Sequence, residues 1–110
     1  MERLVKGDVV VLPFPFSDLS AYKKRPALIL STLEGDDLIL CQITSEARYD
    51  KYAIDLRESN FKEGKLNVSS MIRPNRLFTA EKSIINYKIG SLKSEKLKEV
   101  IDIVIKIFKE

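Results

Sequence analysis

The sequence contains no histidine, no tryptophan and a single cysteine, Cys41, among its 110 residues. Histidine is the usual general base near neutral pH and the commonest metal ligand, so its absence excludes a Ser-His-Asp triad, a Cys-His pair and a histidine-dependent zinc site. One thiol cannot form an internal disulfide, and it fits a reducing compartment. Any chemistry must therefore rest on Arg, Lys, carboxylates, hydroxyls, Tyr or backbone groups.

Long hydrophobic runs are missing as well. No apolar run reaches membrane-spanning length, and residues 1–6 lack the apolar core of a signal peptide, which indicates a cytoplasmic protein without a membrane partner. Hydrophobic residues make up 45% of the chain, enough for one domain, residues 1–110, with a real core. The net charge of +3 permits a nucleic-acid partner without requiring one.

Apolar and β-branched runs predict a mostly β structure. We expect strands at residues 9–12, 25–31, 38–44, 52–56, 66–72 and 76–80, with the third run too apolar for a sheet edge. Prolines 13 and 15 should end the first strand, because prolines at alternate positions cannot join a central ladder. Residues 17–24, 45–51 and 57–64 are predicted loops, 34–37 a hairpin turn, 73–75 a break, 83–85 a helical turn and 87–90 a link.

The C-terminal segment is predicted to be a helix, with Ser91 or Ser94 as its N-terminal cap. Its apolar residues recur at steps of three and four and form an unusually wide face, which indicates burial against the sheet and against another subunit. The predicted fold is therefore a small, strongly bent, mostly antiparallel sheet or barrel with a C-terminal helix packed on it.

A positive cluster, Lys23-Lys24-Arg25, precedes Pro26 and the stiff apolar run 27–30. Proline disfavours helix in the residue before it, so Arg25 should be held extended at the mouth of a strand, where its guanidinium can grip a phosphate. Lys23 and Lys24 either steer an RNA or keep a loop soluble. Phe14 and Phe16 either pin the loop to the core or stack on bases.

Several segments, taken in order, resemble the PemK/MazF toxin family. The segments that resemble the first two strands of that family are Gly7–Val11, Pro13–Phe16 and Arg25–Leu30. Its third-strand signature resembles Gln42–Ser45, and its later strand pair resembles Ser70–Thr79. Each motif is weak alone, but the ordered set spans nearly the whole chain.

This resemblance implies an SH3-like barrel of the kind shared by the CcdB and MazF toxins. It also implies a homodimer that acts as an endoribonuclease toxin, or mRNA interferase. Such an enzyme cuts single-stranded RNA sequence-selectively without metal or cofactor, and a cognate antitoxin protein neutralises it. The RNA sequence that is cut and the identity of the antitoxin do not follow from the residues.

The family's catalytic arginine and threonine correspond to Arg25 and Thr44. In some members an arginine and an aspartate two residues later take part, and here these positions hold Arg73 and Asn75. Asparagine cannot act as a general base, so that version of the mechanism is in doubt. The residues predicted to bind substrate are Lys23, Lys24, Ser45, Arg73, Asn75 and Arg76.

Metal-free RNA cleavage requires the 2′-hydroxyl to attack the adjacent phosphodiester, which leaves a 2′,3′-cyclic phosphate and a 5′-hydroxyl. Arg25 suits stabilisation of the phosphorane, and Thr44 can donate to a phosphoryl oxygen or orient the attacking group. The base is unassigned, with Asp18, Glu46 and Asp50 as candidates.

Two other classes of function stay open. A non-enzymatic toxin that binds DNA gyrase is compatible with the same fold and does not need the Arg25 guanidinium. An SH3-like binding module needs an aromatic-lined groove, which scattered aromatic residues and the absence of tryptophan support poorly.

Overall fold

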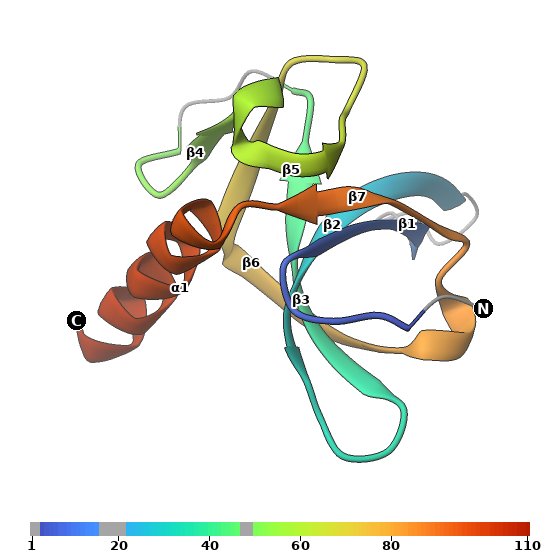
Figure 1. Cartoon of the computed structure of the whole chain (residues 1–110). Helices are drawn as coiled ribbons and strands as arrows, with labels where there is room; N and C mark the ends of the chain where they lie inside the picture. Colours follow the sequence, from blue (N-terminus) through green and yellow to red (C-terminus); the bar gives the residue numbers. More distant parts are fainter. Residues whose placement is uncertain (1–2, 16–21, 47–49) are drawn as a thin grey trace.

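The computed structural model describes residues 3–15, 22–46 and 50–110. In this part of the chain, seven strands form one antiparallel sheet that curls into a half-barrel, and a C-terminal helix lies beside it (Figure 1). The spatial order of the strands is β4-β6-β3-β2-β1-β7-β5. The prediction of a bent, mostly antiparallel sheet with one C-terminal helix is confirmed.

The strands and helices have the following bounds along the chain. They are β1 (Asp8–Pro15), β2 (Tyr22–Thr32), β3 (Asp37–Thr44), β4 (Ile54–Leu56), a 3-10 turn η1 (Glu58–Asn60), β5 (Phe61–Gly64), β6 (Ser70–Glu81), a second 3-10 turn η2 (Lys82–Ile84), β7 (Tyr87–Leu92) and α1 (Ser94–Lys109).

Both faces of the central strands are buried, because the sheet curls around one core and presents its other face to a second. Val9 and Leu28 belong to the core that contains the buried helix residue Val100. Their chain neighbours Val10 and Ile29 belong to the core on the opposite face. This arrangement explains why the strands read as continuous apolar runs rather than as alternating ones. Cys41 is fully buried, and burial raises the pKa of its thiol to about 12.

The prolines of β1 do not end the strand, contrary to the prediction. Pro13 pairs with Lys24 of β2, and the ladder continues to Pro15. On its other side β1 pairs with β7 only over Asp8–Val11. The prolines therefore lie where β1 is paired on one side only. Proline is tolerated at such an edge, because the missing N–H is not needed for a second ladder.

The positive cluster lies within β2, not on a loop as predicted. Lys23 and Lys24 pair with Phe14 and Pro13 of β1, and Arg25 pairs with Leu12. The rest of the predicted loop, residues 17–21, lies outside the described residues. Pairing with β1 holds this segment extended. Pro26 favours the same conformation, because it disfavours helix in the residue before it.

The predicted break at residues 73–75 is a bulge inside one long strand. Gln42 of β3 pairs with Arg73, but the preceding residue, Cys41, pairs with Leu77. Three residues of β6, Pro74 to Arg76, therefore lie outside the regular ladder. Pro74 is buried there, since a proline fits a bulge where no ladder N–H is needed.

Two predicted connections are strands, and part of one predicted strand is not. Residues 61–64 form β5 and residues 87–92 form β7, which pair with each other, whereas residues 66–69 precede β6 as irregular chain. Gly64 and Gly90 permit this pairing, because a Cβ atom on either would overlap the main chain of the other strand. Gly64 also has a positive φ of 74°.

Neither Ser91 nor Ser94, the two predicted caps, is the N-cap of the helix. Its N-cap is Lys93, and Ser94 is its first residue. The hydroxyl of Ser91 instead donates to Asp8 Oδ1 at 2.7 Å, and the Val5 N–H donates to Asp8 Oδ2 at 2.9 Å. The buried Asp8 carboxylate thus joins the N-terminal turn to β7.

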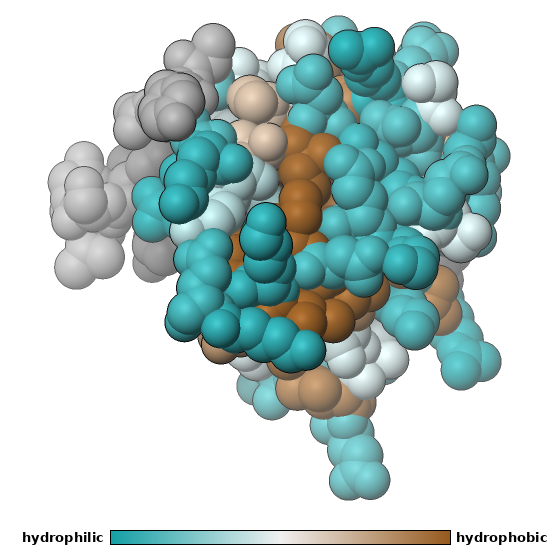
Figure 2. Space-filling model, turned by 90° about the vertical axis from the view of Figure 1, so that its left-hand side faces the viewer, coloured by the Kyte–Doolittle hydropathy of each residue, from teal (hydrophilic) through white to brown (hydrophobic). Residues whose placement is uncertain are grey.

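One face of α1 is only partly covered by the sheet. Val100 is fully buried, whereas Ile105 is 46% and Phe108 73% exposed. Figure 2 looks at the side of the molecule where α1 lies, and it shows an apolar strip bordered by hydrophilic side chains. Over the described part of the chain, no helix is long and apolar enough to cross a membrane.

Candidate active site

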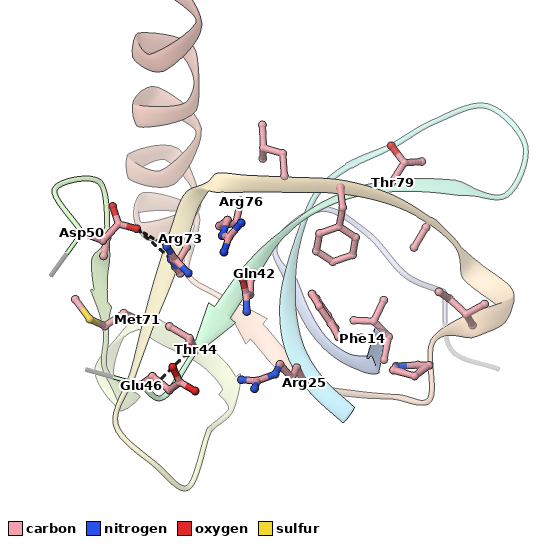
Figure 3. A pocket seen from close by; sticks show the side chains of 17 residues that line it. Phe14, Arg25, Gln42, Thr44, Glu46, Asp50, Met71, Arg73, Arg76 and Thr79 are labelled. Carbon is pink, nitrogen blue, oxygen red and sulfur yellow. Dashed lines mark hydrogen bonds and ion pairs between the residues drawn. The ribbon is translucent and has the colours of Figure 1, made fainter. Parts of the chain in front are cut away.

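A groove of about 790 Å³ opens where β2 and β3 diverge and β6 bends at its bulge. Figure 3 shows the side chains of Arg25, Gln42, Arg73 and Arg76 gathered around it, with Thr44 and Glu46 nearby. Among the described residues, its charged lining consists of three arginines, Arg25, Arg73 and Arg76, and two carboxylates, Glu46 and Asp50. The excess of arginine suits an anionic ligand such as a phosphodiester.

The register of β2 and β3 brings Arg25 and Thr44 together. Ala27 of β2 pairs with Gln42 of β3. Arg25 lies two residues before Ala27, and Thr44 lies two residues after Gln42, so both side chains point to the same side of the sheet as that pair. Arg25 and Thr44 therefore line one groove, just past the Ala27–Gln42 pair at which the β2–β3 ladder ends.

The Thr44 side chain is held by a backbone group two residues further along the chain. Thr44 is the last residue of β3 and is 8% exposed. Its Oγ1 accepts the backbone N–H of Glu46 at 3.1 Å. Because that bond uses a lone pair, the hydroxyl proton can still be donated to a ligand in the groove.

Arg73 is fixed by the carboxylate of Asp50. Its Nε donates to Asp50 Oδ2 at 3.0 Å, and its terminal nitrogen lies 2.9 Å from the same oxygen. The Tyr52 N–H donates to Asp50 Oδ1 at 2.9 Å. This hydrogen bond is the main cause that lowers the pKa of Asp50 below its usual value, and Arg73 lowers it further. A hydrogen bond from Asn75 lowers this pKa further. A carboxyl with a lowered pKa is a weaker base, and both oxygens of Asp50 already accept hydrogen bonds.

The structure places the sequence-predicted site residues, except Asn75, along two grooves. Arg25, Thr44, Arg73 and Arg76 line the first groove. Lys23, Lys24 and Ser45 line a second groove of about 660 Å³, which shares Arg25 and Glu46 with the first. Asn75 is exposed on the bulge and is not among the described residues that line either groove. Among the predicted bases, Glu46 and Asp50 line the first groove, and Asp18 lies outside the described residues.

The predicted site residues did not include two parts of the first groove. Gln42 faces it beside Arg73, its cross-strand partner. Phe14 and Phe78 form an edge-to-face pair at the other end, with ring centroids 4.9 Å apart. Phe14 and Phe16 were expected either to pin the loop to the core or to stack on bases. Phe14 packs against the core, which agrees with the first alternative, and Phe16 lies outside the described residues. The Asp50–Arg73 pair is 23 residues apart in sequence, and no local pattern signals it.

A family model described as the PemK-like, MazF-like toxin of type II toxin-antitoxin systems matches residues 5–108. No curated protein sequence matches the chain.

Several solved structures share the fold. MazF from Deinococcus radiodurans superposes with a TM-score of 0.77 over 100% of both chains, at 19% identity. An endoribonuclease from a mycobacterial species, in complex with its cognate antitoxin, gives 0.75 over 97% of this chain and 96% of that one, at 13% identity. The Mycobacterium tuberculosis toxin MazF-mt6 gives 0.71 over 93% and 96%, at 18% identity.

Proposed function

The chain belongs to the PemK-like, MazF-like toxin family of type II toxin-antitoxin systems, and from this we propose that it is a sequence-selective endoribonuclease acting on single-stranded RNA. The observation that carries the proposal is the placement of Arg25 and Thr44 in one arginine-rich groove. By the resemblance of their segments to the family's motifs, these two residues correspond to the family's catalytic arginine and threonine. A cytoplasmic toxin that cuts mRNA without metal is the corresponding biological role.

The first step of the proposed reaction is attack of the 2′-hydroxyl oxygen on the adjacent phosphorus. The phosphorane that forms carries additional negative charge on its oxygens. The Arg25 guanidinium donates to those oxygens with its planar fork, and the Thr44 hydroxyl donates a further hydrogen bond. The bond to the 5′ oxygen then breaks, and this oxygen takes a proton from water as it leaves, which gives a 2′,3′-cyclic phosphate and a 5′-hydroxyl.

Glu46 is the carboxylate best placed to take the 2′ proton. It lines the groove next to Thr44, and its backbone N–H holds the Thr44 hydroxyl. In Figure 3 the Arg25 and Glu46 side chains point toward each other. Asp50 is less suitable, because the hydrogen bonds of Tyr52 and Arg73 lower its pKa. Positioning and charge stabilisation supply the rest of the rate.

Arg73 and Arg76 are proposed to bind the phosphates on either side of the cleaved bond. Arg73 is 18% exposed and held by Asp50, so it presents a guanidinium of fixed orientation. Arg76 reaches the groove from the bulge of β6. The bulge therefore supplies a positive group that a regular strand would not place there.

A cognate antitoxin and a second copy of this chain are the proposed protein partners. A solved relative is an endoribonuclease in complex with its cognate antitoxin. The exposed apolar residues of α1, Ile105 and Phe108, offer an apolar surface for a homodimer. The arginine-rich groove suits an acidic segment of an antitoxin, which would block RNA from the same groups.

The test is cleavage of a long single-stranded RNA in EDTA by the wild type, Arg25→Ala and Arg57→Ala. Arg57 is a matched control, because its side chain is 76% exposed and lines neither groove. We expect the wild type and Arg57→Ala to cut at the same positions and Arg25→Ala to be slower by about a hundredfold or more. Equal cutting by all three folded proteins would exclude Arg25 from the site. Intact RNA with gyrase-dependent DNA breakage would instead favour the gyrase-binding function.

A further inference from the structure

The second groove combines an apolar floor with an exposed aromatic ring. Val11 of β1 pairs with Pro26 of β2 on one side and with Tyr87 of β7 on the other. These three residues therefore form a row across neighbouring strands, and all three line the groove. Tyr87 is 57% exposed, so its ring is open to a ligand.

Lysines stand on both sides of this floor. Lys24 lies two residues before Pro26, on the same face of β2, and is exposed. Lys65 directly follows Gly64, which packs against Gly90 of β7, and this close pairing brings Lys65 beside the strand that carries Tyr87. Since β2 and β5 flank the β1–β7 pair in the sheet, the two lysines border the floor from opposite sides.

We propose that this groove binds the nucleotides of the RNA that lie just beyond the two that flank the cleaved bond, with one base stacked on Tyr87 and phosphates paired with Lys24 and Lys65. This inference rests on the proposed ribonuclease function. A basic groove with an aromatic platform is how single strands are bound, because every base has a face for stacking and every nucleotide carries a phosphate. Arg25 lines both grooves, so a strand whose reacting phosphate lies at Arg25 continues directly into the second groove.

RNA fits this groove better than an acidic peptide does. Both would be attracted by the lysines. However, the shared Arg25 makes the groove continuous with the place where the phosphodiester reacts, and the exposed Tyr87 ring offers a stacking surface that carboxylates do not use. An acidic peptide is therefore treated as the competing outcome of the test.

The experiment measures binding of two fluorescent oligoribonucleotides by anisotropy. Their sequence comes from the mapped cleavage site, with a 2′-deoxy nucleotide at the cut to prevent reaction. One probe has about eight nucleotides, within the usual site size for single-strand binding. The other has only the nucleotides that flank the cut. The proteins are the wild type, Tyr87→Ala, Tyr87→Phe, Lys65→Gln and the control Lys109→Gln, whose lysine is exposed at the end of α1.

We expect Tyr87→Ala to weaken binding of the long probe about tenfold and to leave the short probe unaffected, while Tyr87→Phe binds like the wild type. Lys65→Gln should reduce the slope of log Kd against log salt by about 0.7 for the long probe only, and Lys109→Gln should not change it. All five proteins should melt at similar temperatures, because the substituted side chains are exposed.

Three results would overturn the inference. If the wild type cuts RNA while Tyr87→Ala and Lys65→Gln bind both probes normally, the proposed function stands and the groove is not an RNA site. If these variants lose binding of an acidic peptide but not of the long probe, the groove is a protein-docking site. If the wild type neither cuts nor binds any RNA, the proposed function fails and this inference fails with it.

Discussion

The Thr44 hydroxyl is the smallest group to which the proposed chemistry assigns a role. Replacing Thr44 by Val keeps the shape and removes the hydroxyl, so we predict that cleavage slows by about a hundredfold. Thr44→Ser should keep most of the activity, because a serine hydroxyl can make the same hydrogen bonds. Single-turnover rates on the mapped RNA check both.

Thr44→Val should also lower the free energy of unfolding by about 1 kcal/mol, because the Glu46 N–H loses its acceptor. Urea unfolding measures this cost separately from activity. A valine variant that cuts at the wild-type rate would remove Thr44 from the mechanism.

Asp50 and Arg73 form a pair in which the charge of the carboxylate can be tested alone. Asp50→Asn keeps an oxygen that can accept the Tyr52 N–H but removes the negative charge beside Arg73. We predict a loss of about 1–2 kcal/mol in unfolding free energy at pH 7 and slower cleavage, because Arg73 loses its fixed orientation. Asp55→Asn is the control, since Asp55 is 65% exposed and lies 3.7 Å from Arg57.

The pH dependence of this loss has a defined sign. The pKa of Asp50 is lower in the folded state than its ordinary value of 3.8. The stability that it contributes is therefore complete above that ordinary value and disappears as the pH falls through the folded pKa. The difference between wild type and Asp50→Asn should shrink below about pH 4. A difference that stayed constant down to pH 2 would show that the charge is not responsible.

At the scale of elements, the pairing of β5 with β7 depends on two glycines that touch. A Cβ on Gly90 would overlap the Glu63 carbonyl oxygen, which is main chain and cannot rotate away. Gly35 offers a contrast, because its φ is +78° but an added Cβ would meet open space among the described residues.

We predict that Gly90→Ala destabilises the fold more than Gly35→Ala does. Gly35→Ala should cost about 1–2 kcal/mol, the ordinary penalty of a left-handed backbone. Gly90→Ala must separate β5 from β7 or bend both strands. Its cost in unfolding free energy therefore includes the loss of contacts between these strands. Denaturant unfolding compares the two variants, and amide exchange of β5 shows where the sheet opens. Equal costs would mean that β5 adjusts easily.

The sequence predicted some elements well and others not at all, for physical reasons. The runs that became β2 and β3 are apolar enough to specify buried strands, and the helix has a strong 3.6-residue period. β7, in contrast, contains Lys88, Gly90 and Ser91, which favour no strand by themselves. Its conformation comes from pairing with β1 and β5, and pairing between distant segments is not visible in a local pattern.

The candidate site shows the same division. Arg25 and Thr44 were identified because each lies in a short segment resembling a family motif, and the fold places both in one groove. The Asp50–Arg73 contact and the Lys65–Tyr87 side of the second groove join segments that are far apart in the chain. Such contacts require the register of the whole sheet.

At the scale of the whole molecule, one curled sheet holds two grooves that meet at Arg25. The central claim is that the 2′-hydroxyl of the RNA itself attacks the phosphodiester held there. The most direct test is cleavage of two oligoribonucleotides that differ only in a 2′-deoxy substitution at the mapped cut, with the wild-type protein in EDTA. We predict that the all-RNA oligonucleotide is cut to a 2′,3′-cyclic phosphate and that the substituted one stays intact. Cleavage of the substituted oligonucleotide at the same bond would contradict the mechanism, because attack would then come from water.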